Sequence, residues 1–293
     1  MRLLEDLPKF TVRQGVSLKN FTSFKIGGEA RSFFFPYSVS QLRTVIRKLS
    51  TTREGFYILG RGSNLLINDS PLRKPVIKLG RGFDYISKLE GNLLEVGAAT
   101  SFSKLLAYCL KEKLGGLERL GGIPGSVGGV VVMNASSFGG EFSSFVEEVE
   151  VLDKEGEEKV LKKKEIDFRY RDSSLKKMFV TKVKIKLFPK ENVEERFYYF
   201  LSQRLKKQDW SFPSAGSIFK NPSFKPAAFL IESCGLKGKG KGDVQVSPKH
   251  ANFIINRGGG KAKDVVYLIE LIKEKVYKKW NVLLEEEIIR WEI

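Results

Sequence analysis

The spacing of hydrophobic residues alternates between two periods along the chain, which predicts a mixture of helices and strands. From Val39 to Leu49 hydrophobic residues recur every three or four positions, and this period predicts an amphipathic helix. The apolar run Phe56–Leu59 comes next and predicts a short strand. Residues 24–36, before the helix, predict two strands around a Gly27-Gly28 turn. The beginning of the chain therefore predicts an α/β unit.

The rest of the chain keeps this mixture, with a strand-rich middle followed by a mixed C-terminal part. The charged run Glu155–Lys164 is typical of a solvated hairpin edge. The polar stretch 188–196 indicates a domain boundary. The predicted helices are 102–112, capped by Ser101, then 193–207, 227–233 and 263–279, and the predicted strands are 76–79, 93–97, 146–152, 159–161, 180–187, 251–256 and 283–291.

Composition limits the class of protein. The 293 residues are 42% hydrophobic and 29% charged, which is ordinary for a globular protein. No apolar run approaches the roughly 18–20 residues of a membrane span. Acidic residues stand at Glu5 and Asp6, where a signal peptide would have its apolar core. We therefore expect a cytoplasmic protein that does not enter a membrane.

Cysteine and histidine are too few for most metal sites. The two cysteines, Cys109 and Cys234, have no spacing that suggests a metal site or a disulfide framework. His250 is the single histidine, which excludes His-rich metal sites and, unless His250 itself serves, a Ser-His-Asp triad. We expect no bound metal.

The net charge is strongly positive, because Lys and Arg total 51 and Asp and Glu total 34, a difference of +17. Such a charge favours anionic partners, which include nucleotides, acidic sugars and nucleic acid. A Lys- and Glu-rich surface of the kind found in thermostable proteins gives the same balance. The alternation Lys237–Gly242 has no interleaved aromatic residues to stack bases, so it indicates a mobile basic loop or one that touches a diphosphate. We favour an anionic small ligand.

Two glycine clusters are placed where a ligand could approach the backbone. Gly60-Arg61-Gly62-Ser63-Asn64 follows a predicted strand, and a tight turn there would present several N–H groups to a phosphate. It matches neither the Rossmann fingerprint nor a P-loop, and a plain turn is the alternative. Gly121–Gly129 carries five glycines and could lie against a large flat ligand, with Asn134-Ala135-Ser136 at its ring edge. A purely structural glycine loop is the alternative there.

The segment Ser214–Pro222 combines a serine, a lysine and an asparagine. The small pair Ala215-Gly216 lets another molecule approach the backbone beside Ser217. A serine hydroxyl can give or accept a proton, and Lys220 and Asn221 can hold anionic or polar groups. For this segment alone, a Gly-Ser turn entering a strand is the alternative.

Taken together, these segments resemble the UDP-N-acetylenolpyruvoylglucosamine reductases, the flavin enzymes of peptidoglycan precursor synthesis. The resemblance runs in order from about residue 20 to the end of the chain. Each segment is weak alone, and seven in sequence are highly specific. They are Thr22–Gly28, Gly60–Leu66, Gly121–Asn134, Phe168–Ser173, Ser214–Pro222, Gly235–Asn256 and Leu284–Glu287.

The resemblance implies an α+β fold with a two-lobed FAD-binding domain of the p-cresol methylhydroxylase and vanillyl-alcohol oxidase type, and a C-terminal α+β substrate domain. We place the lobes at 1–75 and 76–190 and the substrate domain at 191–293, whose last strand could pack back toward the flavin. It also implies non-covalent FAD, NADPH as co-substrate and a UDP-sugar substrate, in a monomer that binds no nucleic acid. The residues expected to bind FAD are Gly60, Arg61, Gly62, Ser63, Asn64, Leu65, Gly122, Ile123, Pro124, Gly125, Ser126, Gly128, Gly129, Asn134 and Ala135.

The resemblance further implies three catalytic residues. Hydride arriving at the CH2 of the enolpyruvyl group leaves negative charge on the adjacent carbon and its carboxylate. Arg171 would pair with that carboxylate, Ser217 would deliver the proton to carbon, and Glu287, if protonated, would add a hydrogen bond. The residues expected to contact the substrate are Tyr170, Asn221 and Lys237.

The chain departs from the family pattern in places. Ser136-Ser137-Phe138 stands where many members have Gly-Ala-Tyr. Only 45 residues separate Arg171 from Ser217, as in a shorter subgroup that lacks a tyrosine-bearing loop over the substrate. Many members have Val-Arg after the final glutamate, and here an extra residue shifts Arg290 by one position. In a strand that shift turns the side chain to the other face, so Arg290 is assigned no ligand.

Two other functions compete with this one. An oxidase of the same FAD fold would ignore NADPH, and some of these oxidases tether FAD through histidine. The position of His250 in the C-terminal part speaks against such a tether. A nucleic-acid binder would explain the positive charge, and its binding would weaken steeply with salt.

Overall fold

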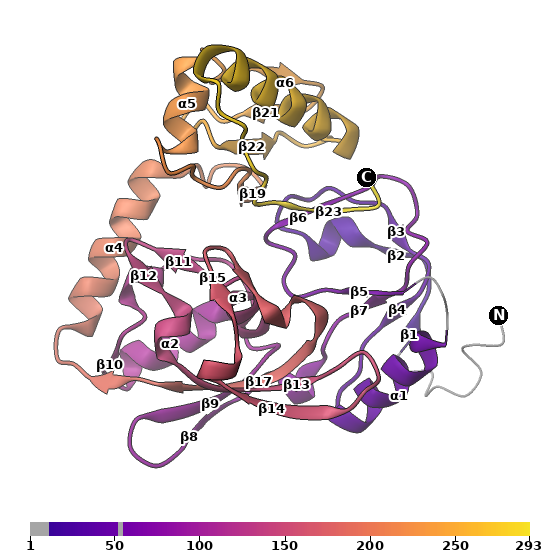
Figure 1. Cartoon of the computed structure of the whole chain (residues 1–293), viewed down its shortest axis with the longest axis vertical. Coiled ribbons are helices and arrows are strands. Elements are labelled where there is room, and N and C mark those ends of the chain that lie inside the picture. The colour runs from indigo at the N-terminus through magenta and orange to yellow at the C-terminus, as the bar shows by residue number, and fades with distance from the viewer. Residues whose placement is uncertain (1–11, 52–54) are drawn as a thin grey trace. The chain divides into compact units, whose positions relative to one another are not determined.

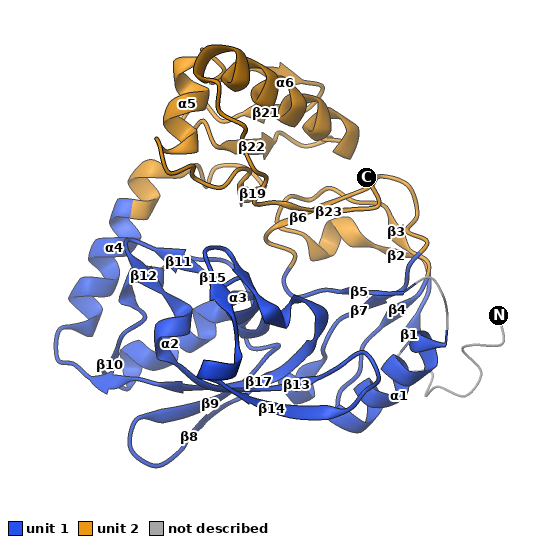
Figure 2. Cartoon of the chain, viewed as in Figure 1, with its two compact units in different colours: residues 1–14, 32–61, 74–203 blue, residues 15–31, 62–73, 204–293 orange. Residues whose placement is uncertain are grey.

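A computed structural model of the chain describes residues 12–51 and 55–293. They form two compact units, each assembled from separate stretches of sequence (Figure 2). The division of the chain at 75 and 190 remains a prediction. The acidic residues that argue against a signal peptide lie outside the described residues. Unit 1 comprises residues 1–14, 32–61 and 74–203, and unit 2 comprises residues 15–31, 62–73 and 204–293.

Unit 1 contains a five-stranded antiparallel sheet in the order β14-β13-β17-β9-β8 (Figure 1). Val149 and Val151 of β13 are buried, and β14 at the edge is charged and largely exposed, which confirms the predicted hairpin edge. The strands are β8 (Ile86–Lys88), β9 (Leu93–Gly97), β13 (Val146–Leu152), β14 (Glu158–Lys162) and β17 (Phe179–Lys186).

Two helices of unit 1 share a hydrophobic core with this sheet. Helix α2 (Phe102–Lys111) begins as predicted, because the Ser101 hydroxyl accepts a hydrogen bond from the N–H of Lys104 at 3.2 Å. Helix α3 (Val127–Val132) was not predicted, because its glycine- and valine-rich sequence has low helix propensity. Its contacts with β9 and β17 override that propensity.

A second, smaller sheet of unit 1 has the order β1-β4-β7-β5, with β4, β7 and β5 parallel. Its core includes the hydrophobic stripe of α1 (Val39–Ser50), at the position that the periodicity predicts. These elements confirm the α/β character expected near the start of the chain. The strands are β1 (Val12–Arg13), β4 (Phe33–Phe34), β5 (Tyr57–Ile58) and β7 (Val76–Ile77).

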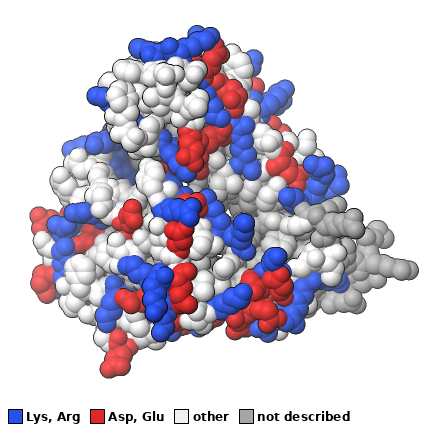
Figure 3. Space-filling model, viewed as in Figure 1, with Lys and Arg blue, Asp and Glu red and all other residues white. Residues whose placement is uncertain are grey.

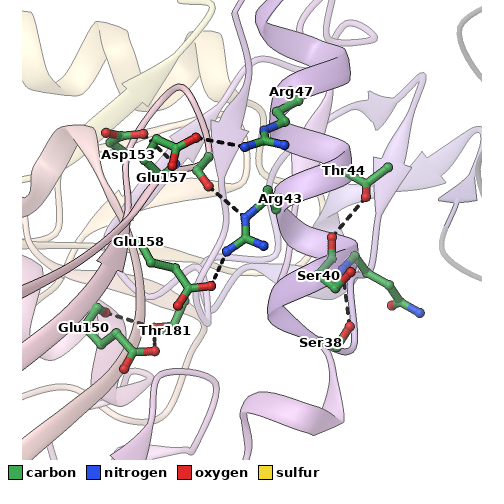
Figure 4. A network of polar contacts seen from close by, with 12 residues as sticks. Ser38, Ser40, Arg43, Thr44, Arg47, Glu150, Asp153, Glu157, Glu158 and Thr181 are labelled. Carbon is green, nitrogen blue, oxygen red and sulfur yellow. Dashed lines mark hydrogen bonds and ion pairs between the residues drawn. The ribbon is translucent and has the colours of Figure 1, made fainter.

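Polar contacts tie α1 to the β13–β14 hairpin (Figure 4). The Nε of Arg43 donates to the carbonyl of Gly156 at 3.1 Å, and its Nη2 pairs with Glu158. Arg47 pairs with Glu157 at 2.8 Å. The small and large sheets of unit 1 are therefore joined by side chains as well as by the chain itself.

The remaining elements of unit 1 are short hairpins and one long helix. Helix α4 (Val193–Lys207) spans the predicted range, and the chain passes from unit 1 to unit 2 within it, after Gln203. The paired strands are β10 (Leu114–Gly115) with β18 (Phe188–Pro189), β11 (Ser136–Ser137) with β12 (Gly140–Glu141), and β15 (Phe168–Arg169) with β16 (Asp172–Ser173).

Unit 2 contains a four-stranded antiparallel sheet, β19-β22-β21-β20, covered by α5 and α6. Both helices were predicted, and Val265, Ile269 and Val276 of α6 are buried in the core. The basic segment 237–242 was predicted as a loop, and this was wrong for Gly240 and Lys241, which pair with β21. The elements are β19 (Ser214–Ser217), α5 (Ala227–Ser233), β20 (Gly240–Lys241), β21 (Val244–Val246), β22 (Phe253–Asn256) and α6 (Ala262–Trp280).

The rest of unit 2 comprises β2 (Val16–Ser17) paired with β3 (Glu29–Ala30), and β6 (Leu65–Ile67) paired in parallel with β23 (Ile289–Trp291). The predicted strand 283–291 was wrong over its first half, which makes only one bridge, from Glu286 to Phe219. The predicted strand before Gly27 is also absent, although Phe24 and Ile26 are fully buried. Buried apolar residues alone do not make a strand without a partner for the backbone.

Charged side chains of both signs lie side by side on the face shown in Figure 3. Many lysines pair with carboxylates, for example Lys184 with Glu148 at 2.8 Å and Lys104 with Asp84 at 2.8 Å. None of the helices within residues 12–51 and 55–293 combines the length and the hydrophobicity that spanning a bilayer requires.

Candidate active site

The first glycine cluster begins where β5 ends. Leu59 still pairs with β7, its N–H donating to the carbonyl of Ile77 at 2.8 Å, and the chain turns at Gly60. A Cβ at Gly60 would lie 2.9 Å from the hydroxyl oxygen of Ser126, closer than a Cβ normally packs, so the chain approaches the Ser126 side chain closely here. Two loops that the sequence predicts to bind FAD, around Gly60 and around Ser126, are therefore adjacent within unit 1.

The second glycine cluster enters α3. The Ser126 hydroxyl caps the helix by accepting from the N–H of Gly129 at 3.3 Å. A Cβ at Gly128 would lie 3.0 Å from the Cβ of Ala98, and the Gly128 N–H donates to the Ala98 carbonyl at 3.0 Å. Gly128 therefore has a structural role in packing the loop against β9. Ile123 and Pro124 are half-buried and exposed, respectively.

Asn134 follows α3 and is 1% exposed. Its amide NH2 donates to the carboxylate of Glu141 at 3.2 Å and to the carbonyl of Arg169 at 3.1 Å, and its oxygen accepts from the N–H of Ser143 at 3.2 Å. The side chain thus positions the β15–β16 hairpin. A contact of Asn134 with the flavin ring stays a prediction.

Arg171 lies in the turn of the β15–β16 hairpin, in unit 1. Its φ is 58°, in the left-handed region that costs a residue with a side chain about 1 kcal/mol or more. Its guanidinium lies 5.6 Å from the ring centre of Tyr170, which is exposed. The hairpin is anchored to α3 as well, because the Ser173 hydroxyl donates to the carbonyl of Val132 at 2.6 Å. A catalytic role for the Arg171 side chain stays a prediction.

Ser217 ends β19, in unit 2. The preceding residue, Gly216, has a φ of +75°, and a Cβ there would meet no atom within 4 Å. The glycine is thus needed for its backbone conformation, and the space beside it is open. The residues after Ser217, Ile218 and Phe219, are buried in the unit 2 core. The Ser217 hydroxyl is therefore attached to backbone that the core holds in place.

The amide of Asn252 replaces a strand partner for this segment. Its oxygen accepts from the N–H of Phe219 at 2.9 Å, and its NH2 donates to the Phe219 carbonyl at 2.8 Å. The Asn252 carbonyl accepts from the N–H of Ile218 at 2.9 Å. Asn252 is 3% exposed, so these bonds lie out of water. Sequence reasoning missed this role, although an asparagine inside an apolar strand pattern was a signal for it.

Glu287 lies beside the same segment. Its N–H donates to the carbonyl of Ile218 at 2.8 Å, and the N–H of Lys220 donates to the Glu285 carbonyl at 2.8 Å. Asn64, predicted to bind FAD, donates from its side chain to the carbonyl of Glu287 at 2.9 Å. Within unit 2, therefore, the structure brings together the segments of Ser217, Glu287 and Asn64.

Arg290, which the sequence left without a role, is held by carboxylates. Its Nε donates to Glu286 at 2.7 Å, and its Nη2 donates to Glu286 at 2.7 Å and to Glu270 at 2.9 Å. Lys273 of α6 also pairs with Glu286. This cluster anchors the residue next to Glu287 to α6, so Arg290 is engaged within the protein.

The predicted substrate residues of unit 2 have partners of their own. The amide oxygen of Asn221 accepts from the N–H of Ala227 at 3.0 Å, at the start of α5. This bond does not use the two N–H donors of the Asn221 amide. Lys237 pairs with Glu232 at 2.7 Å, and Lys220 pairs with Glu285. Asn221 and Lys237 as substrate residues stay predictions.

The predicted site residues divide between the units. Of the predicted catalytic residues, Arg171 belongs to unit 1 and Ser217 and Glu287 belong to unit 2. The predicted FAD residues Gly62, Ser63, Asn64 and Leu65 also belong to unit 2, and the others belong to unit 1. A meeting of the Arg171 guanidinium with the Ser217 hydroxyl remains a prediction.

The residues of unit 1 fit the diphosphate of FAD. Gly60 is at the carboxyl end of parallel strands, where phosphate-containing ligands commonly bind. Arg61 follows it, and Lys78, at the end of β7, donates to the carbonyl of Gly60. Neither cation pairs with a carboxylate anywhere in residues 12–51 and 55–293, so the donor set suits an anion.

Comparisons with known proteins agree with this fit. A model of an FAD binding domain matches residues 30–162, which confirms the predicted FAD-binding domain. A model of the UDP-N-acetylenolpyruvoylglucosamine reductase C-terminal domain matches residues 206–291.

Whole-chain relatives extend this result. The UDP-N-acetylenolpyruvoylglucosamine reductase of Clostridium botulinum (strain Okra / Type B1) is 40% identical over 275 residues, which cover 92% of this chain and 89% of that protein. The protein of the same name from Clostridium novyi (strain NT) is 38% identical over 98% of this chain and 94% of its own length. The crystal structure of UDP-N-acetylenolpyruvylglucosamine reductase from Thermus caldophilus matches with a TM-score of 0.83 and 34% identity, over 96% of this chain and 98% of that one. The predicted α+β fold class is confirmed, and the chain belongs to the UDP-N-acetylenolpyruvoylglucosamine reductase family.

Proposed function

We propose that this chain catalyses the NADPH-dependent reduction of UDP-N-acetylenolpyruvoylglucosamine to UDP-N-acetylmuramate, a step in peptidoglycan precursor synthesis. The chain is an FAD-dependent oxidoreductase of this family, and its relatives carry the name of this reaction. The main support for the proposed residue roles is structural: within unit 2, the segment of Ser217 pairs with the segment of Glu287. Bound FAD supplies the transfer of hydride from NADPH to the substrate.

The chain's own residues stabilise the negative charge that develops on the substrate and supply the proton. Hydride adds to the CH2 carbon of the enolpyruvyl group, so the electron pair of the double bond moves toward the adjacent carbon and its carboxylate. Arg171 pairs with that carboxylate, and such an interaction with developing charge is worth about 3–4 kcal/mol. An arginine guanidinium is a permanent positive charge, which suits it to this role.

Ser217 gives its hydroxyl proton to the adjacent carbon, which completes the lactyl ether. A hydroxyl is a weak acid, and the enolate-like carbon is basic enough to accept from it. Hydrogen bonds with Asn252 and with the Glu287 backbone hold the two residues after Ser217, Ile218 and Phe219, so the hydroxyl is presented from a fixed position. Glu287, when protonated, donates to the substrate carboxylate.

We also propose that the protein acts as a cytoplasmic monomer, because NADPH and nucleotide sugars are made in the cytoplasm and no partner residue is needed for the roles above. The mixture of positive and negative side chains in Figure 3 favours a small anionic ligand over nucleic acid. A yellow protein that oxidises NADPH only when the enolpyruvyl substrate is present supports the reductase, and an oxidase would not consume NADPH.

The test separates the two half-reactions under anaerobic conditions. In Ser217→Ala, NADPH should bleach the flavin at the parental rate, and the enolpyruvyl substrate should restore its colour much more slowly. Ser223→Ala, at an exposed serine six residues along the chain, is the matched control and should behave as the parent. Parental reoxidation in Ser217→Ala would show that Ser217 is not the proton donor.

A further inference from the structure

Lys78 occupies a defined place at the carboxyl end of parallel strands. Its N–H donates to the carbonyl of Phe34 at 2.9 Å, which continues the pairing of β7 with β4 by one residue. On its other side, β7 pairs in parallel with β5, which leads directly into Gly60. All these residues belong to unit 1. The lysine therefore stands between two strands at the edge where the glycine turn begins.

The ammonium of Lys78 faces the turn. It donates to the carbonyl of Gly60, and Arg61 lies close enough to act on it electrostatically. Burial lowers the pKa of Lys78 to about 8, and the charge of Arg61 lowers it in the same direction. Two positive groups are thus held near one another, and the charge of Arg61 makes the charged form of Lys78 less favourable.

Other half-buried lysines of unit 1 pair with carboxylates. Lys182 has carboxylates at 3.3 Å, from Glu95, and at 3.1 Å, from Glu150. Lys190 has the buried carboxylate of Glu118 at 3.1 Å. Lys78 has no carboxylate partner in the described part of the chain. Since an unpaired half-buried cation is unfavourable, its place indicates an anion that comes from outside the chain.

The FAD-binding domain model covers Gly60, Arg61 and Lys78, which selects FAD over NADPH as the source of that anion. We propose that Lys78 is a binding residue for the diphosphate of FAD, with Arg61 as its partner on the same turn. This inference rests on the use of FAD by the family. The lysine has two effects: it holds the Gly60 carbonyl, so that the N–H groups of the turn face the ligand, and it neutralises diphosphate charge.

The test uses apoprotein and three variants at position 78. Lys78→Met removes both the charge and the hydrogen bond, Lys78→Gln keeps a neutral donor for the Gly60 carbonyl, and Lys78→Arg keeps the charge. FAD binding is followed by quenching of flavin fluorescence, and ADP and adenosine are used as competitors. Lys104→Met is the matched control, because Lys104 is exposed and pairs with Asp84.

In Lys78→Met and Lys78→Gln, the affinities for FAD and for ADP should fall about tenfold or more, which corresponds to at least about 1.4 kcal/mol. The affinity for adenosine, which has no phosphate, should not change. Lys78→Arg should keep most of the affinity, and Lys104→Met all of it. The KM for NADPH should stay at the parental value in variants saturated with FAD.

Stability of the apoprotein gives a second readout. The unfolding temperature of apo Lys78→Gln should equal or exceed that of the parent, because an unfavourable buried charge is gone. A purely structural lysine would show the opposite: a lower unfolding temperature and equal losses for FAD, ADP and adenosine. That pattern, or unchanged ADP affinity, would overturn the proposal. A parent protein that binds no FAD would instead overturn the flavin chemistry itself.

Discussion

The two units hold their functional groups in opposite ways. In unit 1, Arg171 sits in a left-handed turn, and Lys78 is a half-buried cation with no carboxylate partner among residues 12–51 and 55–293, so both are kept in unfavourable states. In unit 2, the segment of Ser217 is bound on both sides, by Asn252 and by the Glu287 backbone, which pair with the backbone of Ile218 and Phe219. We therefore propose that a ligand stabilises the two cations of unit 1, whereas the Ser217 segment of unit 2 is positioned by the protein itself.

Substitutions in the two units are therefore expected to change the stability of the protein in opposite directions. Removing a functional group of unit 1 should lower activity or ligand affinity while leaving the apoprotein equally or more stable. Removing a supporting group of unit 2 should lower stability and the substrate reaction together. Stability and function thus trade against each other in one unit and change together in the other.

The largest expected effect is at Arg171. Arg171→Gly should slow flavin reoxidation by the substrate about 100- to 1,000-fold, the factor typical for the loss of one donor to developing charge. It should also raise the free energy of unfolding by up to about 1 kcal/mol, because glycine adopts a positive φ without strain.

Single-turnover kinetics and urea unfolding of the same preparation measure both quantities at Arg171. Lys25→Gly, at another residue with positive φ (57°), is the control for the backbone effect alone. If Arg171→Gly lost stability as well as activity, the left-handed turn would not be a site of strain.

A somewhat smaller effect is expected at Asn252. Asn252→Leu should lower the free energy of unfolding by about 2–4 kcal/mol, because the N–H and carbonyl of Phe219 are left buried without partners. Substrate reduction should slow with it, since Ser217 loses its fixed position, and FAD affinity should not change.

Denaturant unfolding and FAD titration check the prediction at Asn252. Asn92→Ala is the control, because the side chain of Asn92 makes no hydrogen bond in the part of the chain that the structure describes. Wild-type stability in Asn252→Leu would contradict the idea that this amide acts as a strand partner.

The smallest expected effect is a pH dependence. The pKa of Lys78 in the folded apoprotein is about 8, below its ordinary value of 10.5. Between these values the unfolded chain binds more protons than the folded one, so apoprotein stability should rise with pH over this window relative to Lys78→Gln. FAD affinity should change in the other direction and weaken above about pH 8, because the neutral amine no longer attracts the diphosphate.

Fluorescence titrations at several pH values measure this effect. In Lys78→Arg the loss of affinity above pH 8 should be absent, because a guanidinium stays charged. A loss of the same size in Lys78→Arg would assign the pH dependence to another group.

Much of the fold follows from hydrophobic period alone. The predicted helices 193–207 and 263–279 and the strand 146–152 are confirmed within a residue or so, because each has a long amphipathic pattern and faces one core. Periodicity could not find α3, where close packing at Gly128 decides the conformation. It also could not show that residues 282–288 lack a continuous strand partner, since pairing is a property of the whole chain.

The candidate site was less accessible to sequence reasoning. The family resemblance of the motif segments predicted roles for Arg171, Ser217 and Glu287. It did not draw attention to Lys78 or Asn252. Lys78 follows an apolar strand pattern, and Asn252 lies inside one. The role of each side chain depends on partners that are distant in sequence.

The central proposal, which comes from the family resemblance, is that Arg171 and Ser217 act on the substrate in the same step. A double-mutant cycle on the rate of flavin reoxidation, with Arg171→Lys, Ser217→Ala and the double variant, tests it most directly. The account predicts that the double variant is scarcely slower than the slower single variant, because either loss already disables the shared step. Rate losses that multiply in the double variant would contradict the claim, since they would show that the two side chains act independently.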